Sequence, residues 1–494
     1  MTADRAAIPE IEHYELDGIP LFYLPMAGET ILTLMFRVGR ADEPVIHGGM
    51  THLAEHLILT AISDALDHSN GTTEPYRVTF MKRGNPAEVT RFLKDVCDAI
   101  ARPPMYRLYE EARVLLTESN SRSGVSIPIQ LAHYRMGYQG VGVYTLRELF
   151  LGALDEAALR AWIAENFVAG NAAIWIAGQL PEDLYVDLPP GPRRPMPPIA
   201  WIPGLQTPTF VVDDVGGVGV SFVVERSIAG GTAIRTLERR LRQALRVHRG
   251  MAYDVATEPT YLGHDIVHAT VLATCLPENV NEVERIMLEA IDDLAARGPT
   301  EGDIEEQYDR MVRDLADPLS IPGRLDGRAT DELIGHQSPS TSDLLDAYWR
   351  MQPDEAAQAF RAARDSMMLL IPSTGFRPQR VMHPFPDAPR ESPGQGRSFE
   401  QQTSKGKTPW SRAKGVRLTV GDAGIAVDDR DGIRLLGLPW RDCVAVVQST
   451  GARSLLARDG TTLTIAEEDW RGGRDAIGLI DRVAPREVTV PAIQ

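Results

Sequence analysis

Two histidines and a glutamate lie within five residues of the sequence, in the run His52-Leu53-Ala54-Glu55-His56. The surrounding residues predict a helix, and side chains four apart on a helix share one face, so both imidazoles would project from the same side. Glu55 stands one residue before the second histidine, where its carboxylate can reach a water beside a metal ion but not the ion itself. The spacing indicates a zinc centre with His52 and His56 as ligands and Glu55 as general base. The alternative is a polar helix whose histidines make ordinary hydrogen bonds.

A catalytic zinc ion needs a third protein ligand as well as an open coordination position. A second segment of helical pattern, LYEEARVLLTES, carries Glu111 and Glu118. Seven residues are about two helical turns, so these two carboxylates lie on the same face. Either glutamate taken alone is equally compatible with a solvated position on the helix surface.

Residues 12 to about 375 resemble the insulinase and pitrilysin family of zinc metallopeptidases, which includes the mitochondrial processing peptidases. The resemblance is carried by VGRADEP, GGMTHLAEHL, SNGTTEPYRVTF and EEARVLLTES, which follow one another in the order of the family. It implies that Glu118 is the third zinc ligand and that Glu111 is a supporting carboxylate close to the metal. It also implies one zinc ion per chain and the activity of an HxxEH metalloendopeptidase.

A later segment of the same resemblance, LRVHRGMAYDV, contains Arg246 and Tyr253. In the family an arginine and a tyrosine seven residues apart hold the substrate backbone, which implies that role here. A guanidinium can grip a peptide carbonyl, and a phenol can donate to the oxyanion that develops during the reaction, so Tyr253 is also expected to assist catalysis. The other interpretation is a surface arginine and a packed tyrosine near the end of a helix.

The order of the expected strands and helices divides the chain into three folded parts joined by two linkers. Residues 1–185 form an α+β unit that carries the HxxEH motif, and residues 205–375 repeat its order of elements without the motif, as the family's inactive half does. Residues 186–204 are a Pro-rich linker, and residues 376–411 have the composition of a flexible one. Residues 412–494 predict a small all-β barrel capped by a helix, and their GDAGI, LPWRDCVAV and RDGTTLTI runs resemble pleckstrin-homology-like domains.

The composition places the chain among soluble globular proteins. Its 494 residues carry a formal net charge of -17, which argues against a nucleic-acid-binding protein because such a protein would show a basic patch. The three cysteines, Cys97, Cys275 and Cys443, are isolated in the sequence, which excludes a thiolate zinc site and fits a reducing compartment. The N-terminal segment is not leader-like and long apolar stretches are missing, so we expect a cytoplasmic location.

The sequence therefore favours a zinc-dependent endopeptidase that hydrolyses peptides or small unfolded polypeptides. The resemblance implies a closed chamber built from two chains, a homodimer or a heterodimer with a related subunit, in which Arg246 and Tyr253 of one chain face the zinc of the other. A narrower function is the maturation of one precursor peptide. The main alternative is a catalytically silent scaffold or regulatory subunit of a peptidase complex. The sequence offers no support for membrane binding by the C-terminal domain.

Overall fold

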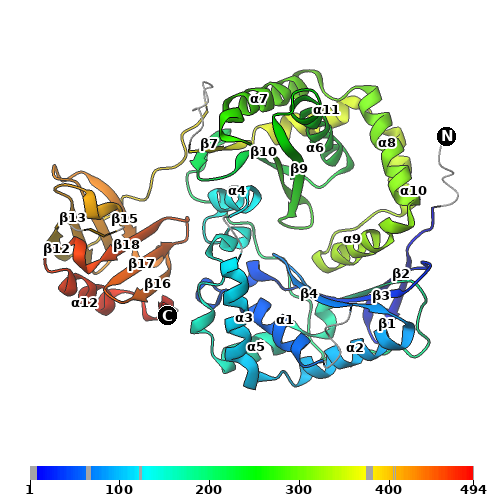
Figure 1. Ribbon diagram of the computed structural model, residues 1–494, viewed down its shortest axis with the longest axis horizontal. Coiled ribbons are helices and arrows are strands. Elements are labelled where there is room, and N and C mark those ends of the chain that lie inside the picture. Colours follow the sequence, from blue (N-terminus) through cyan, green and yellow to red (C-terminus); the bar gives the residue numbers. More distant parts are fainter. Residues whose placement is uncertain are drawn as a thin grey trace.

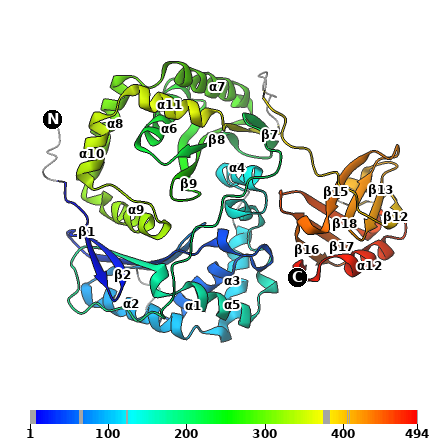
Figure 2. The same cartoon turned by 180° about the vertical axis from the view of Figure 1, so that it is seen from behind.

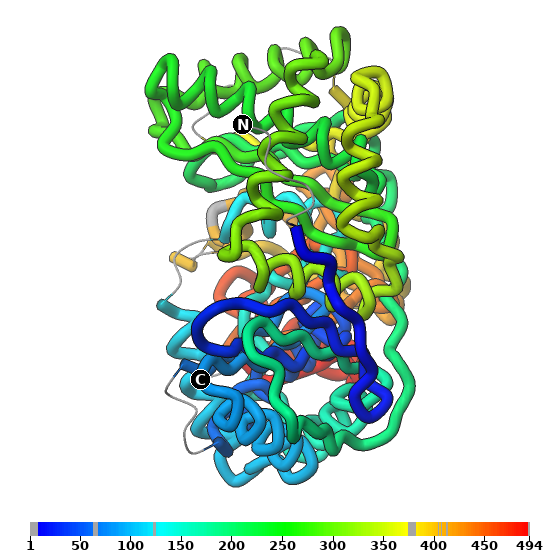
Figure 3. Tube along the Cα trace, turned by 90° about the vertical axis from the view of Figure 1, so that its right-hand side faces the viewer, coloured from blue at the N-terminus to red at the C-terminus, as the bar shows by residue number. Residues whose placement is uncertain are grey.

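Two units of mixed α+β structure lie one above the other, and a smaller domain lies beside them (Figure 1). The computed structural model describes residues 8–62, 68–121, 125–373, 382–403, 405–406 and 408–492. The side view in Figure 3 shows the second unit, in green, above the first unit, in blue. The mixed α+β class expected from the sequence is confirmed.

The first unit is a sheet covered on one face by the helices that follow its strands. Its strands pair in the order β1-β2-β6-β3-β5-β4, so that β4 forms one edge. The strands are β1 (Glu12–Leu16), β2 (Ile19–Leu24), β3 (Thr30–Phe36), β4 (Ser69–Thr73), β5 (Val78–Gly84) and β6 (Ala172–Ala177). The helices are α1 (Met50–Thr60), α2 (Pro86–Ala101), α3 (Leu108–Ser121), α4 (Ile127–Met136) and α5 (Glu156–Asn166), with the short turns η2 (Arg40–Asp42), η3 (Val45–His47), η4 (Met105–Arg107), η5 (Gly140–Leu146), η6 (Leu151–Ala153) and η7 (Ala169–Asn171).

The second unit has the same sheet topology without a counterpart of β1. Its strands pair in the order β7-β11-β8-β10-β9, with one parallel pair, β7 and β11, where the first unit has the parallel pair β2 and β6. The strands are β7 (Thr209–Asp213), β8 (Gly217–Glu225), β9 (Ala252–Tyr261), β10 (Ile266–Cys275) and β11 (Met368–Pro372). The helices are α6 (Ile228–Leu241), the π-helical turn η8 (Arg242–Val247), α7 (Val280–Arg297), α8 (Glu301–Ala316), α9 (Ile321–Ile334), α10 (Thr341–Arg350) and α11 (Pro353–Arg364), with the turns η9 (Pro277–Asn279) and η10 (Pro318–Ser320).

The two units exchange one helix each, which the sequence did not indicate. Helix α9 of the second unit packs on β2, β3 and β6 of the first, and α4 of the first unit packs on β8, β10 and β11 of the second (Figure 2). Helix α9 covers the face of the first sheet that the helices of the first unit leave uncovered, and α4 does the same for the second sheet. The central strands β6 and β11 are consequently buried on both faces, which explains why AAIWIA and MLLIP read as continuous apolar runs.

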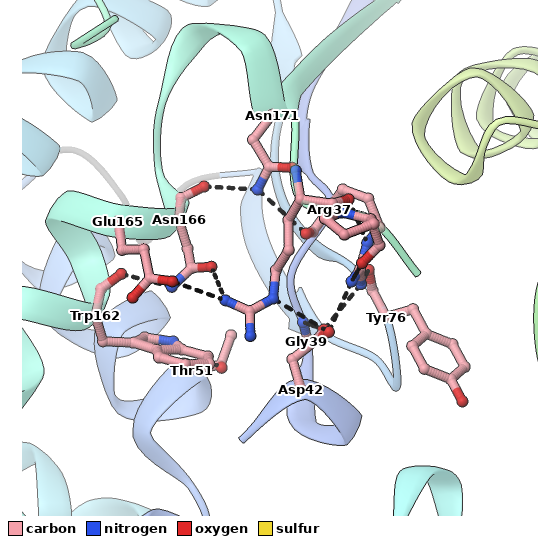
Figure 4. A network of polar contacts seen from close by, with 11 residues as sticks. Arg37, Gly39, Asp42, Thr51, Tyr76, Trp162, Glu165, Asn166 and Asn171 are labelled. Atoms are coloured by element: carbon pink, nitrogen blue, oxygen red, sulfur yellow. Dashed lines mark hydrogen bonds and ion pairs between the residues drawn. The ribbon is translucent and has the colours of Figure 1, made fainter. Parts of the chain in front are cut away.

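The Pro-rich segment 186–204 has no regular secondary structure, and it is tied to the first unit by hydrogen bonds (Figure 4). The fully buried Arg37 pairs with Asp42 at 2.7 Å and donates to the carbonyl of Pro195 at 2.8 Å. Arg194 lies over the Trp162 ring at 5.1 Å, and the Trp162 indole donates to Thr51 of α1. The connection between the units is therefore anchored beside the first turn of α1.

The C-terminal domain consists of two sheets and a helix, and the expectation of a closed barrel is wrong. Within the described residues the strands pair as β12-β13-β14-β15 and as β18-β17-β16-β19. The chain passes from the first of these sheets to the second through the turn η12, which belongs to neither sheet. Buried side chains of both sheets form one shared core. The elements are β12 (Gly396–Glu400), β13 (Arg417–Gly421), β14 (Gly424–Asp428), β15 (Arg434–Pro439), η12 (Trp440–Asp442), β16 (Cys443–Ser449), β17 (Ala452–Ala457), β18 (Thr462–Ala466), α12 (Gly473–Val483) and β19 (Thr489–Pro491), with the turns η11 (Pro409–Arg412), η13 (Glu467–Asp469) and η14 (Arg486–Val488).

Part of the segment expected to be a flexible linker, residues 376–411, is a strand. Residues 396–400 form β12 and pair with β13, because Phe399 is buried in the core of the C-terminal domain. Residues 374–381, 404 and 407 lie outside the described residues. None of the helices in the described ranges is long and apolar enough to cross a membrane.

Candidate metal centre

Helix α1 carries the HxxEH residues, and its start is fixed by a glycine and a carboxylate. Gly49 precedes the helix with a φ of 97°, which favours glycine. The Glu43 carboxylate accepts hydrogen bonds from the backbone N–H groups of Gly49 and Thr51, both at 2.7 Å, and so caps the first turn. Leu53 and Leu57 face the core, which leaves the histidines on the opposite, partly exposed side.

The structure brings the sequence-predicted ligands His52, His56 and Glu118 together. One nitrogen of each ring and one carboxylate oxygen of Glu118 all lie within 4.8 Å of one another. Helix α3 packs against α1, and the distance from His56 Nε2 to Glu118 Oε2 is 3.9 Å.

The outer ring nitrogens of both histidines face carboxylates. His52 Nδ1 lies 3.2 Å from Glu148 Oε1, and His56 Nδ1 lies 3.4 Å from Glu111 Oε2. With Nδ1 engaged in this way, the Nε2 atoms are left to face Glu118. Two imidazoles and one carboxylate, each imidazole backed by a second carboxylate, are the donor set that zinc prefers in catalytic sites, so the residues present fit a zinc ion.

Glu111 occupies the supporting position that the resemblance implied, and Glu148 is a residue that the sequence analysis missed. Glu111 is also paired with Arg107 at 2.8 Å. Glu148 lies between the turns η5 and η6, in a segment with neither helical nor strand periodicity. No pattern in the sequence connects this glutamate with His52, which is 96 residues earlier.

Glu55 is buried next to the ligands. Its Oε2 atom lies 3.9 Å from His52 Nε2, and the Thr73 hydroxyl on β4 donates to it at 2.9 Å. Burial raises the pKa of Glu55 to about 7, against the opposing effects of His52 and of the Thr73 hydrogen bond. A carboxyl with a pKa near 7 can exchange a proton in either direction at neutral pH.

The two histidines differ in how readily they hold a proton. Burial lowers the pKa of His52, but the carboxylates of Glu148 and Glu55 outweigh burial and the net shift is upward. Burial and the neighbouring His52 lower the pKa of His56, and Glu111 opposes them only in part. Carboxylates thus surround the pair of imidazoles, an electrostatic setting that also favours a metal cation.

A pocket of about 240 Å³ opens beside this cluster. It is lined by the HxxEH residues His52 and Glu55, by Glu118, by residues 71–73 of the edge strand β4, and by parts of α4 and of the segment 144–148. Gly71 allows β4 to come close, because a Cβ atom at this position would lie 2.2 Å from Glu55 Oε1.

Arg246 and Tyr253 are not part of this cluster. Arg246 lies in the π-helical turn η8, 3.7 Å from Asp254, and Tyr253 is 85% exposed at the start of β9. The other end of β9, at Tyr261, is the end that meets the first unit. A strand of ten residues spans about 30 Å, so Tyr253 lies at the end of β9 that is remote from the contact with the first unit of its own chain.

Comparison with known proteins connects the fold with one peptidase family. Residues 225–311 match the model described as the peptidase M16 inactive domain, a segment that does not include the HxxEH motif. No curated protein matches the chain. A peptidase M16 inactive domain from Pseudomonas fluorescens is 14% identical with a TM-score of 0.56, and the match covers 74% of this chain and 98% of that one.

Two further structures have the same fold. A protease from Helicobacter pylori is 13% identical with a TM-score of 0.59, covering 74% of this chain and 99% of that one. Pitrilysin is 14% identical with a TM-score of 0.55, covering 76% of this chain and 46% of that one. At such identities the structures show a common fold only. The domain match at residues 225–311 and the fold of the two units together support a relation of this chain to the peptidase M16 family.

Proposed function

We propose that this chain is a zinc-dependent endopeptidase with one zinc ion per chain. The observation that carries the proposal is the convergence of His52, His56 and Glu118 beside a buried Glu55 at an open pocket. When bound, zinc supplies Lewis-acid chemistry, since it polarises a carbonyl group and makes water more acidic. His52, His56 and Glu118 would hold it.

Glu55 is the proton carrier in this proposal. Its carboxylate takes a proton from the attacking water and returns it to the nitrogen of the leaving peptide, which needs a pKa near the working pH. The raised pKa of about 7 fits this role, and the Thr73 hydroxyl fixes the direction of the carboxylate. A dication beside Glu55 would lower that pKa and favour the ionised base.

The edge strand β4 supplies a place for an extended peptide. Its residues Gly71, Thr72 and Thr73 line the pocket, and β5 occupies only one of its two hydrogen-bonding sides. An extended substrate can add to such an edge through main-chain hydrogen bonds, which do not depend on sequence. Peptides and small unfolded polypeptides meet this requirement, whereas folded proteins do not present a free extended segment.

A second chain would complete the site. Arg246 and Tyr253 are exposed and lie near the end of β9 that is remote from the first unit of their own chain, so in this proposal they reach the metal centre of another copy or of a related subunit. In the proposed dimer, Arg246 grips a substrate carbonyl and Tyr253 donates to the oxyanion. Maturation of one precursor peptide in such a chamber is the narrower form of the proposal.

The second candidate is a catalytically silent scaffold or regulatory subunit. It is supported by the match of residues 225–311 to the inactive domain model and by the distance between Tyr253 and the end of β9 that meets the first unit. In that case the pocket would bind peptides or metal without hydrolysis.

Metal content and cleavage of a quenched mixed-peptide library separate these functions. The wild type is expected to hold one zinc per chain and to cleave, and Glu55→Gln is expected to hold zinc without cleaving. Glu118→Gln should lose zinc, whereas Glu110→Gln, on the exposed side of the same helix, should retain both properties. If the wild type binds zinc but does not cleave peptides, even after a related subunit has been added, the scaffold function is favoured. Absence of zinc in the wild type would contradict the proposed centre.

A further inference from the structure

The segment between α4 and α5 carries a buried carboxylate to the back of the metal centre. Glu148 is 4% exposed, and its Oε1 atom lies 3.2 Å from His52 Nδ1 and 2.7 Å from Arg40 Nη1. Gly49 makes room for it, because a Cβ atom at Gly49 would lie 2.5 Å from Glu148 Oε2. The absence of a side chain at Gly49 therefore permits the close contact between Glu148 and the start of α1.

Glu148 and Glu111 stand in equivalent positions. Each carboxylate faces Nδ1 of one histidine and is paired with an arginine. Glu148 uses Oε1 for both His52 and Arg40, whereas Glu111 uses Oε2 for His56 and Oε1 for Arg107. The Arg40 pair is the more enclosed of the two, since Arg40 is buried and lies 5.2 Å from the Tyr144 ring centre, whereas Arg107 is 36% exposed. Glu148 is held through Oε1, and its Oε2 atom is buried without a hydrogen-bond partner among the described residues.

We propose that Glu148 is the positioning residue of His52, a role that rests on the zinc endopeptidase function proposed above. Its carboxylate keeps the proton of the ring on Nδ1, and it fixes the plane of the ring so that Nε2 faces His56 and Glu118. Arg40 prevents the carboxylate from turning away. A carboxylate behind a histidine ligand orients the ring and increases its basicity, and its loss usually lowers metal affinity 10- to 100-fold.

The surroundings of Glu148 keep it in place. Arg147, with a φ of 49°, donates to the backbone carbonyl of Ser119 on α3. Phe150 is buried against the C-terminal domain together with Tyr138, in contact with β16 and β17. The turn that presents Glu148 is therefore held between the helix of the third ligand and the C-terminal domain.

Zinc affinity, measured by competition with a chromogenic chelator, tests the role of Glu148. Glu148→Leu is expected to weaken zinc binding 10- to 100-fold, and Glu148→Gln, which keeps an acceptor oxygen for Nδ1, is expected to lose less. The double variant Glu148→Leu with Arg40→Met removes the buried arginine that the single change leaves without its partner, so it controls for misfolding. Glu110→Leu is the matched control at an exposed carboxylate and should bind zinc as the wild type does.

Cobalt substitution gives a second readout that needs no activity. The visible absorption of bound Co²⁺ reports ligand geometry, and Glu148→Leu should shift or broaden it if the ring of His52 is no longer fixed. Wild-type affinity and an unchanged Co²⁺ spectrum in the folded double variant would overturn the positioning role and leave the proposed function standing. A wild type that binds no zinc would overturn both.

Discussion

If the proposed peptidase function holds, replacement of Gly71 by alanine should abolish cleavage while leaving the protein folded and able to bind zinc. The added Cβ would lie 2.2 Å from Glu55 Oε1, 2.7 Å from Glu55 Cδ and 2.6 Å from Leu59 Cδ1. Contacts below 3.0 Å are not tolerated, so the Glu55 carboxylate has to retreat by at least about 0.8 Å. A retreat of this size breaks the 2.9 Å hydrogen bond from Thr73.

The expected loss follows from that displacement. A misplacement of about 1 Å at a reacting group costs on the order of 100-fold in rate, which corresponds to ~2.7 kcal/mol in the activation free energy. Since the atoms that must move are the ends of flexible side chains, the melting temperature should change little. The three atoms nearest to the new methyl group belong to Glu55 and Leu59 and not to His52, His56 or Glu118, so the variant should still hold one zinc.

The assay compares kcat/KM on a quenched peptide, zinc content and melting temperature for Gly71→Ala and Gly263→Ala. Gly263 lies in the turn between β9 and β10, where a new Cβ meets no atom within 4 Å, so it controls for the chemical change. A Gly71→Ala variant with one bound zinc and a kcat/KM within about threefold of the wild type would refute the role of Glu55 as the base.

Three other predictions concern stability and docking. Burial raises the pKa of Glu284 from 4.5 to about 7, so its contribution to stability is fully present below pH 4.5 and is lost as the pH rises through 7. Glu284→Gln should therefore stabilise the protein by ~1–2 kcal/mol in thermal unfolding at pH 8 and by less at pH 5. Arg135 of α4 donates to Ser221 and to the carbonyl of Ser366 in the second unit. Arg135→Met should cost ~2–3 kcal/mol in denaturant unfolding, and an unchanged midpoint would contradict this. Gly137→Ala would place a Cβ 2.2 Å from the Arg458 carbonyl, so it should undock the C-terminal domain and increase the radius of gyration in small-angle scattering.

Short-range spacing was enough to predict which side chains share a face on α1 and on α3, and the family resemblance supplied the expectation that the two faces meet at a metal. A helix repeats its faces every three to four residues, so the four-residue spacing of His52 and His56 and the seven-residue spacing of Glu111 and Glu118 fix which side chains share a face. The structure places all four at one cluster. The position of Glu55 follows from the same geometry. Three residues after His52 on the helix, its carboxylate lies beside the two histidines without taking the place of either.

Contacts between distant segments could not be predicted in the same way. Glu148 lies in an irregular segment, and only the fold brings it behind His52. The apolar faces of α4 and α9 indicate that each helix is buried, but not that each is buried on the sheet of the other unit. Strand β12 could not be predicted from the composition of residues 376–411, because the strand has a single core side chain, Phe399, among exposed residues.

The exchange of α4 and α9 restricts how a peptide can enter. Opening the two units like a hinge would peel α9 from the first sheet and expose Ile321, Leu325 and Leu333, which are buried there. At ~2 kcal/mol for each side chain, the open form would cost ~6 kcal/mol and be present in about one molecule in 25,000. In the proposed dimer, substrate exchange would then come from relative movement of the two chains, with each chain moving as a rigid body.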